Sequence, residues 1–201
     1  MTLVVDQPRV IHRGKLDYLP ALQAMKDFTR ARDEAAPDEL WLVEHPPVYT
    51  LGQGAADARP ANAIPVVRSD RGGEITYHGP GQVVLYALID LARRGLKVKR
   101  YVWLLEQAVI DALGRGERRP GAPGVYVDGA KIAALGIRVT RGRAYHGLSL
   151  NVDMDLSPFL AIDPCGYPGL KVTQTKELGF SQSPSVMGEL LARTLIQRLD
   201  A

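Results

Sequence analysis

The sequence holds one cysteine, Cys165, in the segment AIDPCGYPG (161–169). Proline and glycine flank it, so the segment is suited to a turn rather than to a packed core. A free thiol has a pKa of about 8.5, and only the thiolate is strongly nucleophilic. A nearby cation favours the thiolate, and Lys131, His78 and His146 are possible partners. The alternative is a small, inert, buried side chain, which is the ordinary state of a lone cysteine.

Lys131 is the second residue that could carry chemistry. In GAKIAALGI it is the only charged residue from Gly129 to Ile137. In a regular strand it would share a face with Ala133, Leu135 and Ile137. We therefore expect either a lysine at a strand end, with its ammonium group in solvent, or a partly buried lysine. Burial would lower the pKa of the amine and suit it to acid–base work.

The segment RSDRGGEITYHGPGQ (68–82) holds four glycines, and its backbone can approach a ligand closely. No lysine follows the glycines and no helix opens after them, so the pattern is neither a phosphate-binding loop nor a dinucleotide fingerprint. The segment is longer than a plain hairpin turn needs, which favours a binding loop. The four histidines show no short spacing and the cysteine is alone, so we expect no metal site.

Composition limits the class of protein. A chain of 201 residues with 46% hydrophobic and 23% charged residues is typical of one globular domain, and we assign residues 1–201 to it. No long apolar run predicts a membrane span, and the first residues do not resemble a secretory signal. One cysteine allows no internal disulfide, which is consistent with a reducing cytoplasm.

Charge argues against nucleic acid as a partner. The net charge is only +3, aromatic residues are 6%, and no nucleic-acid-binding motif is present. Basic residues nevertheless gather in three segments. They are either solvated loops or a docking surface for acidic proteins. The three groups are Arg93, Arg94, Lys97, Lys99 and Arg100; Arg115, Arg118 and Arg119; and Arg138, Arg141 and Arg143.

Hydrophobic periodicity predicts an α+β fold with a mixed, mostly antiparallel sheet. Turn signals at Asp128-Gly129 and Arg141-Gly142 separate three strand-like runs between residues 124 and 156. We expect further strands at 3–5, 9–12, 40–45, 48–52, 65–69 and 83–91, and helices at 17–32, 99–113 and 184–199. A doubly wound parallel sheet would need regular alternation of strands and helices, which is missing.

Four motifs occur together in one order: RGGEITYHGPGQ (71–82), GVYVDGAKIAALGIR (124–138), YHGLSLNVDMDLSPF (145–159) and IDPCGY (162–167). With them the chain resembles the lipoyl(octanoyl) transferase family of acyltransferases. The resemblance implies the catalytic fold of biotin and lipoate protein ligases, in which helices flank a larger and a smaller sheet.

The resemblance also implies a reaction. Such enzymes move an octanoyl group from octanoyl-acyl carrier protein to the ε-amine of one lysine in a lipoyl domain, as the first step of protein lipoylation. The acceptors are the E2 subunits of 2-oxoacid dehydrogenases and the glycine cleavage H protein. The donor is already a thioester, so no ATP or other cofactor is implied.

The matching positions suggest residue roles. Cys165 would carry the octanoyl group as a thioester, and Lys131 would activate the thiol and then transfer protons. Ser149 stands where the family often has alanine, and His78 and His146 have no assigned role. The residues that would line the acyl site are Arg71, Gly72, Gly73, Glu74, Ile75, Thr76, Tyr77, His78, Ala134, Leu135, Gly136, Gly147, Leu148 and Ser149.

Three other functions compete with this one. An ATP-dependent lipoate or biotin protein ligase would share the fold and the lysine but would not need Cys165. A non-catalytic module that binds carrier protein would form no covalent adduct. A cysteine hydrolase would release free octanoate.

Overall fold

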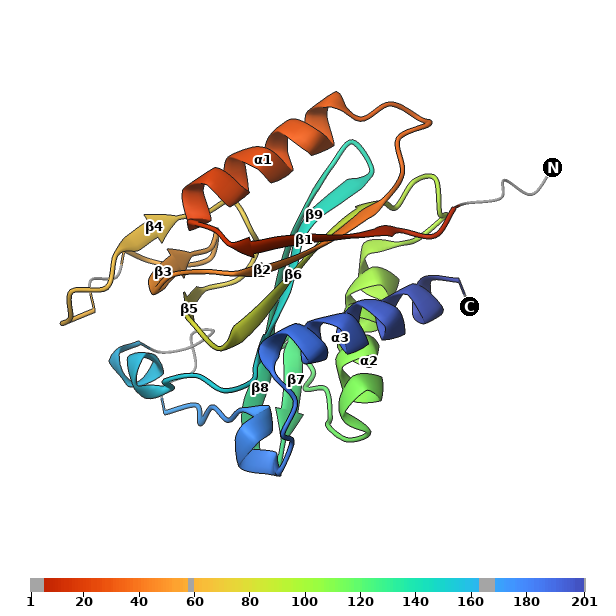
Figure 1. The fold of residues 1–201 in the computed structure, drawn as a ribbon. Helices are drawn as coiled ribbons and strands as arrows, with labels where there is room; N and C mark the ends of the chain where they lie inside the picture. Colours follow the sequence, from red (N-terminus) through yellow and green to blue (C-terminus); the bar gives the residue numbers. More distant parts are fainter. Residues whose placement is uncertain (1–5, 58–59, 163–168, 201) are drawn as a thin grey trace.

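The computed structural model describes residues 6–57, 60–162 and 169–200. They form a six-stranded sheet in the order β1-β2-β6-β9-β8-β7 and a three-stranded sheet in the order β4-β3-β5 (Figure 1). The predicted α+β class with a larger and a smaller sheet is confirmed. The strands are β1 (Arg9–Lys15), β2 (Glu39–Glu44), β3 (Val48–Leu51), β4 (Val66–Arg68), β5 (Ile75–His78), β6 (Gln82–Asp90), β7 (Gly124–Val127), β8 (Ala130–Thr140) and β9 (Arg143–Asn151).

The large sheet lies between helices. Helix α1 (Tyr18–Ala31) covers one face, and α2 (Val98–Leu113) and α3 (Pro184–Leu199) cover the other (Figure 1). Every residue of β6 is buried because both of its faces are covered. Val83 and Leu85 pack in the core with α2 and α3, whereas Val84 and Tyr86 pack with α1. The continuous apolar run of this strand is therefore explained.

The helices begin and end at residues that favour a helix terminus. Helix α2 ends at Gly114, whose φ of 65° is the left-handed conformation that closes a helix. Helix α3 begins at Pro184, and the Ser183 side chain accepts a hydrogen bond from the Val186 N–H. These predicted ranges agree with the structure to within one residue.

The predicted meander is confirmed. Asp128 and Gly129 have φ of 49° and 84°, and Arg141 and Gly142 have φ of 49° and 77°, so both pairs form tight hairpin turns. One prediction needs correction, because residues 75–78 of the glycine-rich segment are not loop but strand β5 of the small sheet. The run predicted at 3–5 lies outside the described residues.

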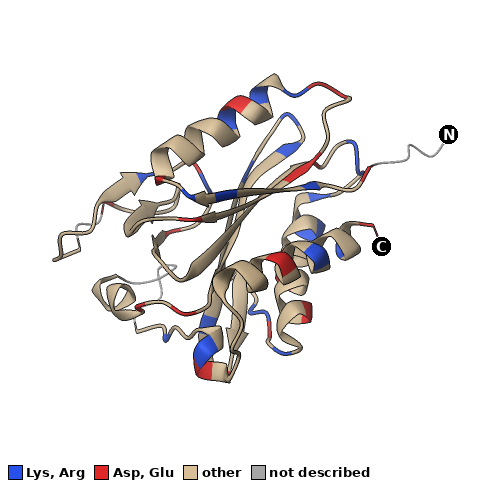
Figure 2. Cartoon of the chain, viewed as in Figure 1, with Lys and Arg blue, Asp and Glu red and all other residues tan. Residues whose placement is uncertain are grey.

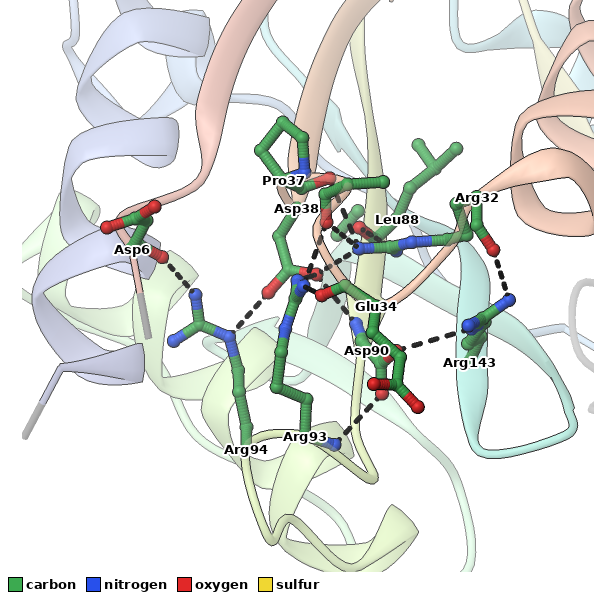
Figure 3. A network of polar contacts seen from close by, with 12 residues as sticks. Asp6, Arg32, Glu34, Pro37, Asp38, Leu88, Asp90, Arg93, Arg94 and Arg143 are labelled. Atoms are coloured by element: carbon green, nitrogen blue, oxygen red, sulfur yellow. Dashed lines mark hydrogen bonds and ion pairs between the residues drawn. The ribbon is translucent and has the colours of Figure 1, made fainter. Parts of the chain in front are cut away.

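A buried carboxylate accounts for two residues of the first basic group, Arg93 and Arg94 (Figure 3). The side chain of Asp38 is fully buried and lies 2.6 Å from Arg32, 2.8 Å from Arg93 and 2.6 Å from Arg94. It also accepts a hydrogen bond of 2.8 Å from the Asp90 N–H. The sequence left these residues as either solvated or part of a docking surface, whereas the structure gives Arg93 and Arg94 an internal role, because they join the start of β2 to the end of β6.

No helix within the described ranges is both long enough and apolar enough to cross a membrane.

Candidate active site

A β-bulge decides where the Lys131 side chain lies. Val125 pairs with Ala133 but Tyr126 pairs with Lys131, so Ile132 is an extra residue in β8. Val125 and Ala133 belong to the core beneath α2. The bulge shifts the alternation by one residue and turns Lys131 to the opposite face. Our expectation that Lys131 shares a face with Ala133 is therefore corrected.

Lys131 lines a small buried cavity together with Thr76, Ser149 and Asn151. Only 3% of the residue is exposed, and its Nζ atom lies 5.3 Å from the centroid of the Tyr126 ring. Of the two alternatives that the sequence left open, the structure shows a buried lysine rather than a solvated strand end.

The backbone of Lys131 pairs with the segment that follows the cysteine motif. Its N–H donates to the Lys171 carbonyl at 2.8 Å, and its carbonyl accepts from the Thr173 N–H at 2.9 Å. Ile162, the first residue of the motif, and Val172, which follows the motif, pack against the same core of the small sheet. Cys165 itself lies outside the described residues.

Glu106 binds the backbone of Gly124, the residue that packs against the Lys131 side chain. A Cβ atom at Gly124 would lie 2.6 Å from the Ala133 carbonyl oxygen and 2.4 Å from Lys131 Cε, so the backbone requires glycine here and any other residue would displace the lysine side chain. The Gly124 N–H donates to Glu106 at 3.0 Å, and Arg118 lies 3.2 Å from the same carboxylate. Burial raises the pKa of Glu106, which Gly124, Arg118 and Lys131 oppose.

Glu106 was not predicted from the sequence as a functional residue. A signal was present, because it lies on the apolar face of α2, four residues after Val102 and three before Val109.

A larger cavity of about 480 Å³ adjoins the Lys131 cavity, and the two share Thr76, Ala134 and Ser149. Tyr77 of the predicted acyl site is not in its wall but packs against Tyr49 and Phe159 in the small sheet. The other predicted residues line it, namely Arg71, Gly72, Gly73, Glu74, Ile75, Thr76, His78, Ala134, Leu135, Gly136, Gly147, Leu148 and Ser149. The wall also contains His146, whose role the sequence left open, and eight residues that the sequence did not indicate, namely Tyr18, Val84, Tyr86, Val102, Gly121, Ala122, Pro123 and Ile137.

Arg71 holds the glycine-rich segment in shape. Its guanidinium donates to the carbonyls of Thr50 at 2.6 Å, Gly72 at 3.0 Å and Glu74 at 2.8 Å. The Gly72 N–H in turn donates to the Ile137 carbonyl at 3.0 Å, which seats the segment on β8. This basic residue therefore binds the backbone of the cavity wall.

Two of the glycines are needed because backbones approach each other. A Cβ atom at Gly147 would lie 2.1 Å from the Leu85 carbonyl oxygen of β6, and one at Gly136 would lie 2.9 Å from the Gly72 carbonyl oxygen. Neither contact can be relieved by a side-chain rotation. These glycines let the glycine-rich segment and β6 close around the cavity.

The rings of Tyr18, His78, Tyr86 and His146 line part of the large cavity. Tyr86 donates its hydroxyl to His45 Nε2 at 2.7 Å, because His45 Nδ1 donates to the Leu16 carbonyl at 2.6 Å. His78 Nδ1 lies 2.7 Å from Gln82 Oε1, and burial together with His45 lowers the pKa of His78 to about 3. Burial likewise lowers the pKa of His45. The two imidazoles are uncharged at neutral pH.

Within residues 6–57, 60–162 and 169–200, no group of three His, Cys, Asp or Glu side chains is arranged to hold a metal ion.

Comparison with known proteins gives consistent results. Residues 17–192 match the family described as the lipoyl protein ligase A/B catalytic domain. The octanoyltransferase of Dechloromonas aromatica (strain RCB) is 56% identical over 200 residues, which cover 96% of this chain and 98% of that protein. The octanoyltransferase of Thiobacillus denitrificans (strain ATCC 25259 / T1) is 59% identical over 188 residues, with 90% and 86% covered.

Solved structures support the fold. A lipoate-protein ligase A bound with ATP has a TM-score of 0.77 at 15% identity, with 97% of this chain and 86% of that chain covered. The biotin protein ligase from Aquifex aeolicus in complex with biotin and ATP has a TM-score of 0.58 at 10% identity, with 96% and 70% covered. The expected ligase-type catalytic fold is confirmed.

Proposed function

The chain belongs to the octanoyltransferases of the lipoyl protein ligase A/B catalytic-domain family, and from this premise we propose how its own residues transfer an octanoyl group. The donor is octanoyl-acyl carrier protein. The acceptor is the ε-amine of one lysine in a lipoyl domain, of E2 subunits of 2-oxoacid dehydrogenases or of the glycine cleavage H protein. Residues 1–201 act as one catalytic domain in a reducing cytoplasm, where the single thiol stays free.

Cys165 is the nucleophile of the first step. Lys131 takes the thiol proton, and the thiolate attacks the carbonyl carbon of the octanoyl thioester. A new C–S bond forms at Cys165 while the bond to the carrier sulfur breaks. The carrier thiolate leaves with the proton from Lys131. One thioester replaces another, so the step needs no ATP.

The second step returns the enzyme to its starting state. The acceptor amine attacks the acyl-Cys165 carbonyl and loses a proton to Lys131. The C–S bond breaks, and Cys165 recovers its proton from Lys131. The product is an amide, which is more stable than the thioester. Lys131 thus serves as base and then acid in both steps.

The observation that carries this proposal is the position of Lys131. Its side chain is buried beside a cavity that shares Thr76, Ala134 and Ser149 with the 480 Å³ cavity. Its backbone is hydrogen-bonded to Lys171, close along the chain to Cys165. A thiolate from the cysteine motif and an octanoyl chain in the large cavity would therefore both lie next to Lys131.

Intact-mass spectrometry tests the two steps separately. Mixing the enzyme with octanoyl-carrier protein is expected to add one octanoyl group to the enzyme, and a lipoyl domain is then expected to remove it. Cys165→Ala forms no adduct. Lys131→Met keeps the thiol but forms the adduct at least about a hundredfold more slowly, as expected when a general base is removed. A wild-type enzyme that never carries the octanoyl mass would overturn the proposal.

The same assay separates the rival functions. An ATP-dependent ligase would modify the lipoyl domain with ATP and free octanoate, and Cys165→Ala would remain active. A hydrolase would release octanoate when the lipoyl domain is present. A binding module would form no adduct with any donor.

The basic residues on and beside α2 are assigned to docking of the acidic carrier protein. Lys99 and Arg100 are exposed on α2, the helix whose Val102 lines the large cavity. Figure 2 shows basic residues at the start of this helix and in the loop that follows it. Arg100 and Arg118 lie 4.2 Å and 4.5 Å from the centroid of the Trp103 ring, which fixes both guanidinium groups on this face. Charges beside the cavity would guide an acidic partner.

A further inference from the structure

Glu106 is a carboxylate on a helix face that is otherwise apolar. Only 8% of its side chain is exposed, and Val109, three residues later, belongs to the core. Burial of a carboxylate costs stability unless its partners offset the loss of water. The Gly124 N–H is one partner, at 3.0 Å. A neutral glutamine could accept the same hydrogen bond, so this contact alone does not require a charge.

Glu106 and Lys131 meet at Gly124, which begins the edge strand β7 of the large sheet. The Gly124 nitrogen lies 3.0 Å from Glu106 Oε1, and Lys131 Nζ lies 3.1 Å from the position of a Cβ atom at Gly124. The nitrogen and the Cβ position of one residue are about 2.5 Å apart. Glu106 Oε1 and Lys131 Nζ are therefore separated by at most about 9 Å.

The two side chains interact through their charges. Burial raises the pKa of Glu106, and the charge of Lys131 is among the causes that oppose this rise. Because an interaction between two charges is mutual, the carboxylate also favours the charged form of the amine. At an effective dielectric constant of about 20, a unit charge about 9 Å away displaces a titration by about one pH unit.

The other elements around Lys131 contribute neutral, basic or exposed groups within the described part of the chain. Tyr126 of β7 places its ring beside the amine, and the Arg119 guanidinium lies 4.3 Å from the centroid of the same ring. Lys171, whose carbonyl accepts from the Lys131 N–H, has an exposed side chain. Glu177 accepts from the Thr173 hydroxyl at 2.8 Å but is exposed to solvent, which screens its charge. Strands β5 and β9 contribute the uncharged side chains of Thr76, Ser149 and Asn151.

We propose that Glu106 is a positioning residue for the catalytic amine: its carboxylate holds Lys131 as the ammonium ion and so sets the pH above which the thiol is activated. This inference rests on the proposed function above. Arg118, 3.2 Å from the carboxylate, keeps Glu106 ionised in its buried position.

Two variants separate the charge of Glu106 from its hydrogen bond. Glu106→Gln keeps an oxygen that can accept from the Gly124 N–H but removes the charge. Glu106→Asp keeps the charge but is shorter by one methylene group, which weakens the contact with Gly124. Glu117→Gln is the matched control, because Glu117 lies 3.6 Å from Arg119 but exposes 61% of its side chain. Thermal unfolding checks that each variant is folded.

The readout is the rate at which Cys165 is modified between about pH 5 and about pH 10, measured by intact mass. Octanoyl-carrier protein gives the rate of adduct formation. Iodoacetamide, which is uncharged, gives the reactivity of the thiol without the carrier. Both rates rise as the pair formed by Lys131 and Cys165 loses one proton, and the midpoint of this rise is compared. Removal of a nearby negative charge lowers the midpoint whichever group loses the proton.

In Glu106→Gln the midpoint is expected about one pH unit below that of wild type with both reagents, and in Glu106→Asp and Glu117→Gln within about 0.3 unit of it. A purely structural role predicts the reverse, with Glu106→Gln unchanged and Glu106→Asp slower at every pH, and overturns the inference. A midpoint in Glu106→Asp one unit below wild type also overturns it, because that variant keeps the charge. These results overturn the inference alone when wild type forms the octanoyl adduct, whereas a wild type without the adduct overturns the proposed function as well.

Discussion

Replacing Asp38 by asparagine removes the charge that three arginines share while it preserves the shape of the side chain. Arg32 and Arg94 expose only 1% and 5% of their side chains, so solvent cannot replace the lost carboxylate. Breaking a buried ion pair by removal of one partner costs about 3–5 kcal/mol of unfolding free energy. A chain of this length loses about 2–4 °C in Tm per kcal/mol, so we expect a fall of about 10 °C.

Asp153→Asn is the matched control for this prediction. Asp153 makes an ion pair of 2.8 Å with Lys176, but the two side chains are 54% and 63% exposed. Exposed pairs contribute at most about 1 kcal/mol, so its Tm is expected to change by less than about 3 °C. The assay is thermal unfolding at neutral pH followed by circular dichroism. Equal Tm changes in the two variants would refute the reasoning.

The difference in unfolding free energy between wild type and Asp38→Asn also depends on pH. The pKa of Asp38 is below its ordinary value of 3.8, because hydrogen bonds from Asp90, Arg94 and Arg32 outweigh the opposing effect of burial. A lowered pKa contributes stability above the unfolded value, and this contribution is lost as the pH falls through the folded value. The two proteins should therefore converge in stability only below about pH 4.

Three further outcomes are expected. Because burial lowers the pKa of His78 from 6.5 to about 3, unfolding takes up a proton in this window, and stability falls by about 1.4 kcal/mol per pH unit below pH 6.5. Chemical denaturation of His78→Asn should show a slope smaller by that amount, and an unchanged slope would contradict the burial of a neutral ring. Gly124→Ala should lose octanoyl transfer even at temperatures where the protein is folded. Gly95→Ala is the control, because Gly95 also has a positive φ but no atom lies within 4 Å of the added Cβ. This variant should lose stability only. Lys99→Glu should raise the KM for the carrier protein, with an effect that weakens as salt is added, and Arg30→Glu on α1, across the sheet, should not.

Local chemistry alone predicted most of the secondary structure. Gly114 ends one helix and Pro184 begins another because of backbone conformation, which depends on immediate neighbours. The turns at residues 128–129 and 141–142 follow from the same kind of preference. The apolar run of β6 indicated a strand covered on both faces. The gathering of thirteen of the fourteen predicted acyl-site residues around one cavity followed from motifs that lie on adjacent elements.

Pairing between distant segments decided the rest. Alternation placed Lys131 with the core residues, but the extra residue Ile132 in β8 exists only relative to β7, so no local pattern contains it. The sequence alone indicates that Arg93 and Arg94 are surface charges, and only the fold shows that both pair with Asp38. His146 has a positive φ in the middle of β9, and its ring contacts Asp70, which comes from another segment. Residue types thus determined which groups could do chemistry, whereas the direction in which each group points depends on register and on burial, which are properties of the assembled sheets.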